Sequence, residues 1–171
     1  RRQRQMCIRD RFYSALNILG THDTPRILTL LGAEHVPGTK DARAAYRLSP
    51  EERQKGEARL RVGEMLLYCF PGSPTVYYGD EAGMEGFEDP LNRKTYPWDR
   101  QDRALLDFFR SLGQLRRHRP SLQDGDLTYV YAQGGALVLR RQLGDEITVA
   151  ALNAGETAVE VSLPWPRDLA R

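Results

Sequence analysis

The sequence predicts an α/β fold that gives way to an antiparallel sheet, and two patterns predict it. Up to residue 120, short apolar runs of strand length alternate with longer segments whose apolar residues recur every three or four positions. From Gly125 onward, apolar residues recur at every second position, which is the period of a half-buried strand. The chain has 171 residues, enough for one domain with its own core.

The first eleven residues are set apart from this pattern. Residues 1–11 are rich in arginine, lack an apolar period and read as a disordered tail or a non-native extension encoded at the end of a DNA fragment. We exclude them from fold reasoning. If they are non-native, the true upstream sequence is missing.

The first structural element is a short apolar run over residues 16–19, which predicts a buried strand. Gly20 ends this strand and a polar stretch follows. Pro25 then opens a helix predicted over residues 24–31, which stops at Gly32.

His22 and Asp23 therefore sit at the carboxyl end of a predicted buried strand. In an α/β barrel, the loops at this end assemble the active site. The alternative is local: Asp23 or Thr24 caps the following helix, and His22 is an ordinary hydrogen-bonded imidazole. The spacing alone favours the capping alternative.

The longest helix begins at residue 49. A short helical piece over residues 41–47 precedes it, and Ser49, Pro50 and Glu52 form a capping box with proline at the first helical position. The helix is predicted to end near Phe70. The apolar residues expected to pack on the strands recur at helical spacing: Ala58, Val62, Met65, Leu66 and Cys69.

A second strand is predicted over residues 73–78, between glycine and proline breakers. Residues 79–99 then show little periodicity, and a loop of this length in a compact domain is usually functional. A helix over residues 101–119 follows, with Asp102 in its first turn and Pro120 as its stop. Its apolar stripe is Leu105, Phe108, Phe109, Leu112 and Leu115.

The remainder predicts four antiparallel strands joined by glycine-containing turns. The strands are expected at residues 127–131, 136–141, 147–153 and 159–163, with turns at 134–135, 144–145 and 154–155.

Two strings resemble a known family. Residues 17–26, NILGTHDTPR, and the segment from Pro71 to Trp98 resemble the α-amylase superfamily, glycoside hydrolase family 13, and most of all its cyclomaltodextrinase, neopullulanase and maltogenic amylase group. The resemblance runs from residue 12 to the end. A complete (β/α)8 TIM barrel needs about 250 residues, so it implies a carboxyl-terminal fragment. Residues 12–120 would be barrel strands seven and eight with their helices, and residues 121–171 the start of a β-sandwich domain, truncated at both ends.

The resemblance implies retaining hydrolysis of α-glucosidic bonds. The nucleophile and the acid/base carboxylate of the family follow strands four and five, upstream of residue 1, so this fragment alone is expected to be inactive. Asp23 would be the third catalytic carboxylate, which bonds the 2- and 3-hydroxyls of the distorted sugar and stabilises the transition state. His22 would contact the same sugar.

The long loop carries two further candidates. Asp89 and Arg93 resemble a pair that contacts glucose units on the non-reducing side of the cut, and their groups suit vicinal hydroxyls. An ion pair that merely stabilises the loop is an equal alternative. Arg26 matches a position that helps hold chloride in some amylases, but pairing with a nearby carboxylate is favoured.

Other polar and aromatic residues are given no catalytic role. Asp80 and Glu81 are expected to lie behind the site. Tyr96 and Trp98 could stack on sugar faces, although burial of Trp98 under the loop is favoured.

Charge and cysteine content exclude several classes. Net charge is +2, from 25 basic and 23 acidic residues that are dispersed, so no nucleic-acid partner is expected. No run of about 18 apolar residues predicts a membrane span. Cys7 and Cys69 form no disulfide framework, which favours a cytoplasmic over a secreted protein, and Cys69 is expected in the core.

No zinc or calcium pattern occurs, so no cofactor is predicted in this segment, and calcium stays open only for the upstream part. A homodimeric full-length parent also stays open.

The predicted partner is an α-glucan oligosaccharide: a cyclodextrin, pullulan or a maltodextrin. The alternatives are another family 13 specificity, α-1,6-glucosidase or trehalose-forming, and a non-catalytic amylase-like homologue. The loop string DPLNRKTYPW favours the cyclomaltodextrinase side, and the presence of both His22 and Asp23 argues against a non-catalytic homologue. A carbohydrate-binding module alone would not explain the strand–helix segment before the sheet.

Overall fold

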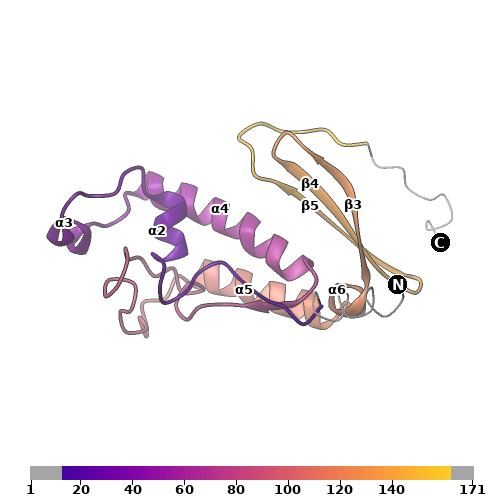
Figure 1. Ribbon diagram of the computed structural model, residues 1–171, viewed down its shortest axis with the longest axis horizontal. Helices are drawn as coiled ribbons and strands as arrows, with labels where there is room; N and C mark the ends of the chain where they lie inside the picture. Colours follow the sequence, from indigo (N-terminus) through magenta and orange to yellow (C-terminus); the bar gives the residue numbers. More distant parts are fainter. Residues whose placement is uncertain (1–12, 163–171) are drawn as a thin grey trace, which may run out of the picture.

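A computed structural model describes residues 13–162 (Figure 1). Long helices and a short parallel strand pair form one part, and an antiparallel sheet forms the other. The prediction for residues 1–11 lies outside the described residues. The helices are α2 (Ile27–Gly32), α3 (Lys40–Ala45), α4 (Pro50–Cys69), α5 (Arg103–Arg117) and α6 (Pro120–Asp124).

Strands β1 (Leu16–Ile18) and β2 (Ser73–Thr75) pair in parallel, with Leu16 opposite Ser73 and Ile18 opposite Thr75. The carboxyl ends of the two strands therefore lie side by side. Both strands are shorter than predicted. The expected burial of β1 is wrong, because Leu16 is 73% and Ile18 is 41% exposed. Within the described residues β1 has only β2 beside it, so its other edge and its faces are incompletely covered.

The start of α4 is as predicted. The Ser49 side chain accepts a hydrogen bond from the Glu52 backbone N–H, while the Glu52 side chain accepts from the Ser49 N–H. This capping box satisfies amide donors that a helix start otherwise leaves free. The alternative in which Asp23 or Thr24 caps α2 is wrong, because Arg26 is the N-cap residue of this helix and no side-chain hydrogen bond caps it.

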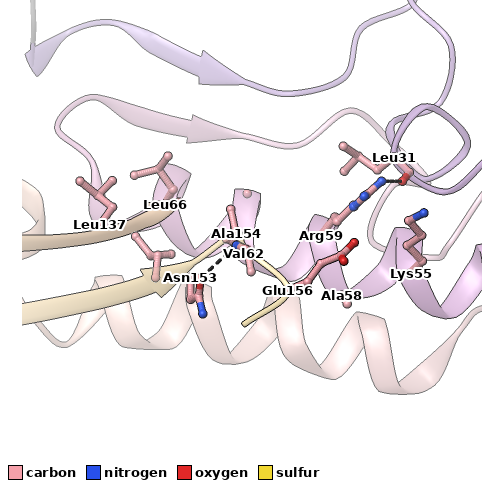
Figure 2. A pocket seen from close by; sticks show the side chains of 14 residues that line it. Leu31, Lys55, Ala58, Arg59, Val62, Leu66, Leu137, Asn153, Ala154 and Glu156 are labelled. Carbon is pink, nitrogen blue, oxygen red and sulfur yellow. Dashed lines mark hydrogen bonds between the residues drawn. The ribbon is translucent and has the colours of Figure 1, made fainter. Parts of the chain in front are cut away.

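The buried face of α4 differs from the predicted one. Leu60, Glu64 and Leu67 are buried together with Cys69, whereas Ala58 is exposed and the other predicted residues are only partly buried. The predicted apolar side chains Ala58, Val62 and Leu66 instead line a cavity of about 860 Å³ between α4 and the sheet (Figure 2). Helical spacing revealed an apolar face but not the neighbours that cover it.

Two clusters form the core. The first joins α2, α4 and α5 through Ile27, Leu28, Leu60, Leu105 and Phe109. The second joins the end of α4 to α6 and the sheet through Cys69, Leu122 and Ala150, which confirms Cys69 as a core residue. Pro120 not only follows α5 but begins α6, a helix that the sequence patterns did not reveal.

The sheet contains β3 (Asp126–Gln133), β4 (Ala136–Leu143) and β5 (Glu146–Asn153), in that order and antiparallel. Gly134 and Gly144 adopt positive φ in the two tight turns. The predicted fourth strand is wrong for residues 159–162, which form no strand; Leu163 lies outside the described residues. The buried Arg141 guanidinium donates to the carbonyls of Cys69 and Gly125 and so ties the sheet to α4.

Candidate functional site

The loops that follow β1 and β2 meet at the carboxyl end of the strand pair. The Arg26 amide donates to the Gly86 carbonyl at 2.8 Å, and the Gly86 amide donates to the Thr29 hydroxyl at 2.9 Å. Parallel pairing brings these loops together, although they are more than fifty residues apart in the chain.

The four predicted site residues lie in one row of polar contacts. His22 Nε2 is 3.3 Å from Asp23 Oδ2, and Arg93 Nη2 is 3.7 Å from Asp23 Oδ1. Arg93 Nε is 3.0 Å from Asp89 Oδ1. The structure thus brings together residues from both loops that the sequence placed apart.

All four side chains are open to solvent. The exposed fractions are 61% for His22, 73% for Asp23, 59% for Asp89 and 45% for Arg93. The row therefore offers two carboxylates, a guanidinium and an imidazole to a ligand, groups suited to a surface of many hydroxyls. The Asp89–Arg93 ion pair is present, and because both side chains stay accessible, it leaves room for either alternative.

A buried ion pair joins the same two segments as the row. Arg26 donates to the Tyr78 carbonyl and to Asp80 Oδ1, the latter at 3.2 Å, and the Asp80 carboxylate is 3% exposed. The guanidinium also lies over the rings of Tyr77 and Tyr78. Burial raises the pKa of Asp80 to about 6, against the opposing effect of Arg26. Arg26 is thus paired with a nearby carboxylate, the alternative that the sequence favoured.

Asn92 was missed by the sequence analysis. Its side chain is fully buried, and Nδ2 donates to the carbonyls of His22 at 2.7 Å and Thr24 at 2.8 Å. The only signal in the sequence was its place between Asp89 and Arg93. An amide side chain at such a position can hydrogen-bond the protein backbone while the neighbouring side chains bind a ligand.

The predicted burial of Trp98 is wrong. Its side chain is 74% exposed, and its ring lies 4.7 Å from that of Tyr96, centroid to centroid. The two rings contact each other at the end of the long loop, and Trp98 does not pack beneath the loop.

The large cavity lies elsewhere and has a different character. Apolar side chains from α2, α4 and the sheet line most of it, and Lys55, Arg59 and Glu156 are its charged residues (Figure 2). Nothing in this lining matches paired carboxylates for glycoside chemistry.

Two searches of the described residues bear on metal and membrane. Across residues 13–162, no cluster of three or more His, Cys, Asp or Glu side chains could hold a metal ion. In the same range, no helix is both long and apolar enough to cross a membrane.

Comparison with known proteins assigns the chain to a family. The family model for the α-amylase catalytic domain matches residues 2–104, more than half of the chain. The chain belongs to the α-amylase family. It is 36% identical to an amylopullulanase of Thermoanaerobacter thermohydrosulfuricus over 94% of its length, and 32% identical to a cyclomaltodextrinase of Geobacillus thermopakistaniensis over 88%.

Solved structures agree with this assignment. An Anoxybacillus α-amylase superposes with a TM-score of 0.69 at 32% identity, covering 88% of this chain and 29% of that one. A Nostoc punctiforme debranching enzyme, soaked with acarbose, superposes with a TM-score of 0.68 at 29% identity, covering 90% and 28%.

This family member spans only a small part of its relatives. It covers 12% of the amylopullulanase and 23% of the cyclomaltodextrinase. Maltogenic α-amylase of Bacillus acidopullulyticus and neopullulanase 2 of Thermoactinomyces vulgaris are also among its relatives, at 33% and 30% identity. The group named from the sequence motifs is therefore confirmed, and the related enzymes are glycoside hydrolases.

Proposed function

We propose that this chain forms the carboxyl-terminal part of a retaining α-glucan hydrolase and supplies its third catalytic carboxylate, Asp23. In this proposal β1 and β2 are barrel strands seven and eight, and β3 to β5 begin the β-sandwich domain. The single observation that carries the proposal is the row from His22 through Asp23 and Arg93 to Asp89 at the carboxyl edge of two parallel strands.

The role of Asp23 follows from its position and charge. An accessible carboxylate beside an imidazole can accept hydrogen bonds from two neighbouring sugar hydroxyls. Such bonds strengthen as the ring flattens toward an oxocarbenium ion, so they lower the barrier rather than only binding the substrate. His22 orients the same sugar, and Asp89 and Arg93 contact a neighbouring unit.

The chain alone is proposed to be inactive. Retention requires a nucleophile and an acid/base about 5–5.5 Å apart across the scissile bond. Asp23 and Asp89 do not fill these roles here, because Arg93 lies between them and contacts both. The two missing carboxylates would come from the preceding part of the barrel.

The proposed substrates are cyclodextrins, pullulan and maltodextrins. Relatives named cyclomaltodextrinase and neopullulanase support this choice. A second candidate is cleavage of α-1,6 branch points, which a debranching enzyme among the structural neighbours favours. The disaccharide that the complete enzyme releases from panose would separate the two linkages, because cleavage of its α-1,6 bond yields maltose and cleavage of its α-1,4 bond yields isomaltose.

The test is Asp23→Asn in the complete enzyme that contains this chain. The exchange keeps the shape of the side chain and removes its charge, so kcat should fall at least about 100-fold with an unchanged melting temperature. Turnover equal to the parent would reject the catalytic role of Asp23. A parent enzyme without any hydrolase activity would instead support the non-catalytic homologue.

A further inference from the structure

Asn92 holds the backbone on both sides of Asp23. Its Nδ2 group donates one hydrogen bond to the carbonyl of the residue before Asp23 and one to the carbonyl of the residue after it. Both partners are acceptors only, so the amide must present its nitrogen to them. A single buried side chain thus brackets the proposed catalytic carboxylate.

Few other contacts fix this segment. The Asp23 amide donates to the Thr21 hydroxyl at 3.2 Å, and the Thr24 amide donates to the Thr21 carbonyl at 3.4 Å. These bonds form a local turn within the same loop. Arg93 contacts the Asp23 side chain at 3.7 Å from the other loop, whereas the two Asn92 bonds hold the backbone of the segment and are shorter, at 2.7 and 2.8 Å.

The backbone just before Asn92 is closely packed. Gly86 packs so closely on the Leu91 carbonyl that an added Cβ would lie 2.2 Å from its oxygen. Gly86 is also bonded across to Arg26 and Thr29. The residue just before Asn92 therefore packs against Gly86, which is itself bonded to the segment after β1.

We propose that Asn92 is a positioning residue for Asp23, and the proposal rests on the function proposed above. It touches no substrate, because its side chain is fully buried. It acts by fixing where the Asp23 carboxylate lies relative to the sugar. Displacement of a reacting group by about 1 Å can lower a rate 100-fold. Loss of the two buried bonds, which would allow such a displacement of Asp23, should therefore lower turnover.

The first variant is Asn92→Ala in the complete enzyme. It removes both donors and leaves the carbonyls of His22 and Thr24 without them. We expect kcat to fall about 10- to 100-fold while KM changes less than about threefold, because Asp23 acts mainly on the transition state. Asn17→Ala is the matched control, since Asn17 Nδ2 also donates to a backbone carbonyl, that of Pro71, at 2.7 Å, but away from the row.

A double-mutant cycle with Asp23→Asn distinguishes positioning of Asp23 from a purely structural role, because only positioning makes the effects of the two substitutions on kcat non-additive. If Asn92 acts through Asp23, Asn92→Ala should reduce kcat less than about threefold further in the Asp23→Asn background. An equal loss in both backgrounds would reject the positioning role. Full turnover of Asp23→Asn alone would reject the proposed function and this inference with it, so the two failures are distinguishable.

Asn92→Asp serves if the alanine variant does not fold. An ionised carboxylate cannot donate to either carbonyl, whereas a protonated one can donate to one of them. Turnover relative to the parent enzyme should therefore rise as the pH falls. A ratio that stays constant with pH would contradict the assigned donor role.

Discussion

The Arg26 guanidinium lies 3.2 Å from the Asp80 carboxylate, and these side chains are 1% and 3% exposed. The pair joins the residue that opens α2 to the loop after β2. Two further Arg26 nitrogens, Nε and Nη2, are buried without a hydrogen-bond partner among the described residues. Asp80 is therefore the single carboxylate that balances this buried charge in the described part of the chain.

Removing that balance should be costly. Asp80→Asn leaves Arg26 buried and charged, since a guanidinium stays protonated, and we expect the free energy of unfolding to fall by about 3–5 kcal/mol. Asp107→Asn is the control, because the Asp107–Arg110 pair makes a similar contact at 3.0 Å on an exposed surface, and its loss should cost less than about 1 kcal/mol. Denaturant unfolding of the complete enzyme measures both. Equal losses would contradict the importance of burial.

Glu64 should make stability depend on pH. Burial, with a smaller contribution from Asp80, raises the pKa of Glu64 from 4.5 to about 8. Between these values the folded state binds more protons than the unfolded state, so the free energy of unfolding should fall as the pH rises. The slope approaches about 1.4 kcal/mol per pH unit.

Glu64→Gln tests this dependence, because glutamine does not titrate. The fall in melting temperature from pH 5 to pH 7.5 should be smaller in this variant than in the parent protein. Asp80 contributes in the same direction only up to its own pKa of about 6, so a difference above that pH is assigned to Glu64. An identical fall in both proteins would show that Glu64 does not titrate there.

Two glycines in helices should respond in opposite directions to alanine. An added Cβ at Gly56 would lie 3.0 Å from the Gly32 Cα and 3.0 Å from the Leu28 carbonyl, so α2 and α4 would have to separate. Gly56→Ala should cost about 1–3 kcal/mol. Gly113 in α5 has nothing within 4 Å of the added atom, and Gly113→Ala should add about 0.5–1 kcal/mol. Stabilisation by both would show that α2 and α4 are not in close contact.

Asp89→Ala separates substrate binding from loop stability. If Asp89 contacts a glucose unit distant from the cut, KM should rise several-fold for maltohexaose and little for maltotriose, since only the longer substrate fills that subsite. The alternative role, an exposed ion pair with Arg93, predicts equal effects on both substrates. Initial-rate kinetics on the complete enzyme decides between them.

Local signals in the sequence were read well. Ser49, Pro50 and Glu52 predicted the start of α4, because a capping box is formed by residues three positions apart and needs no tertiary partner. The turns at Gly134 and Gly144 were predicted for the same reason. The motifs around His22 and Asp89 also led to the family that the comparisons confirm.

Burial was read less well. Trp98 was expected in the interior and Leu16 in a buried strand, yet both side chains are largely exposed in the structure. Apolar character and spacing state which residues gain from burial, but the neighbours that cover them come from distant parts of the chain. The missed Asn92 has the same origin, because its two partners lie 68 and 70 residues away.

The sequence by itself predicted most element types, the approximate place of each and the family, and it proposed four site residues, because each of these depends on neighbouring residues or on a contiguous motif. Tertiary structure alone decided that those four residues form one row, that Arg26 is paired with Asp80, and that Asn92 grips both flanks of Asp23. These contacts exist because the parallel pairing of β1 and β2 places two distant loops at one edge.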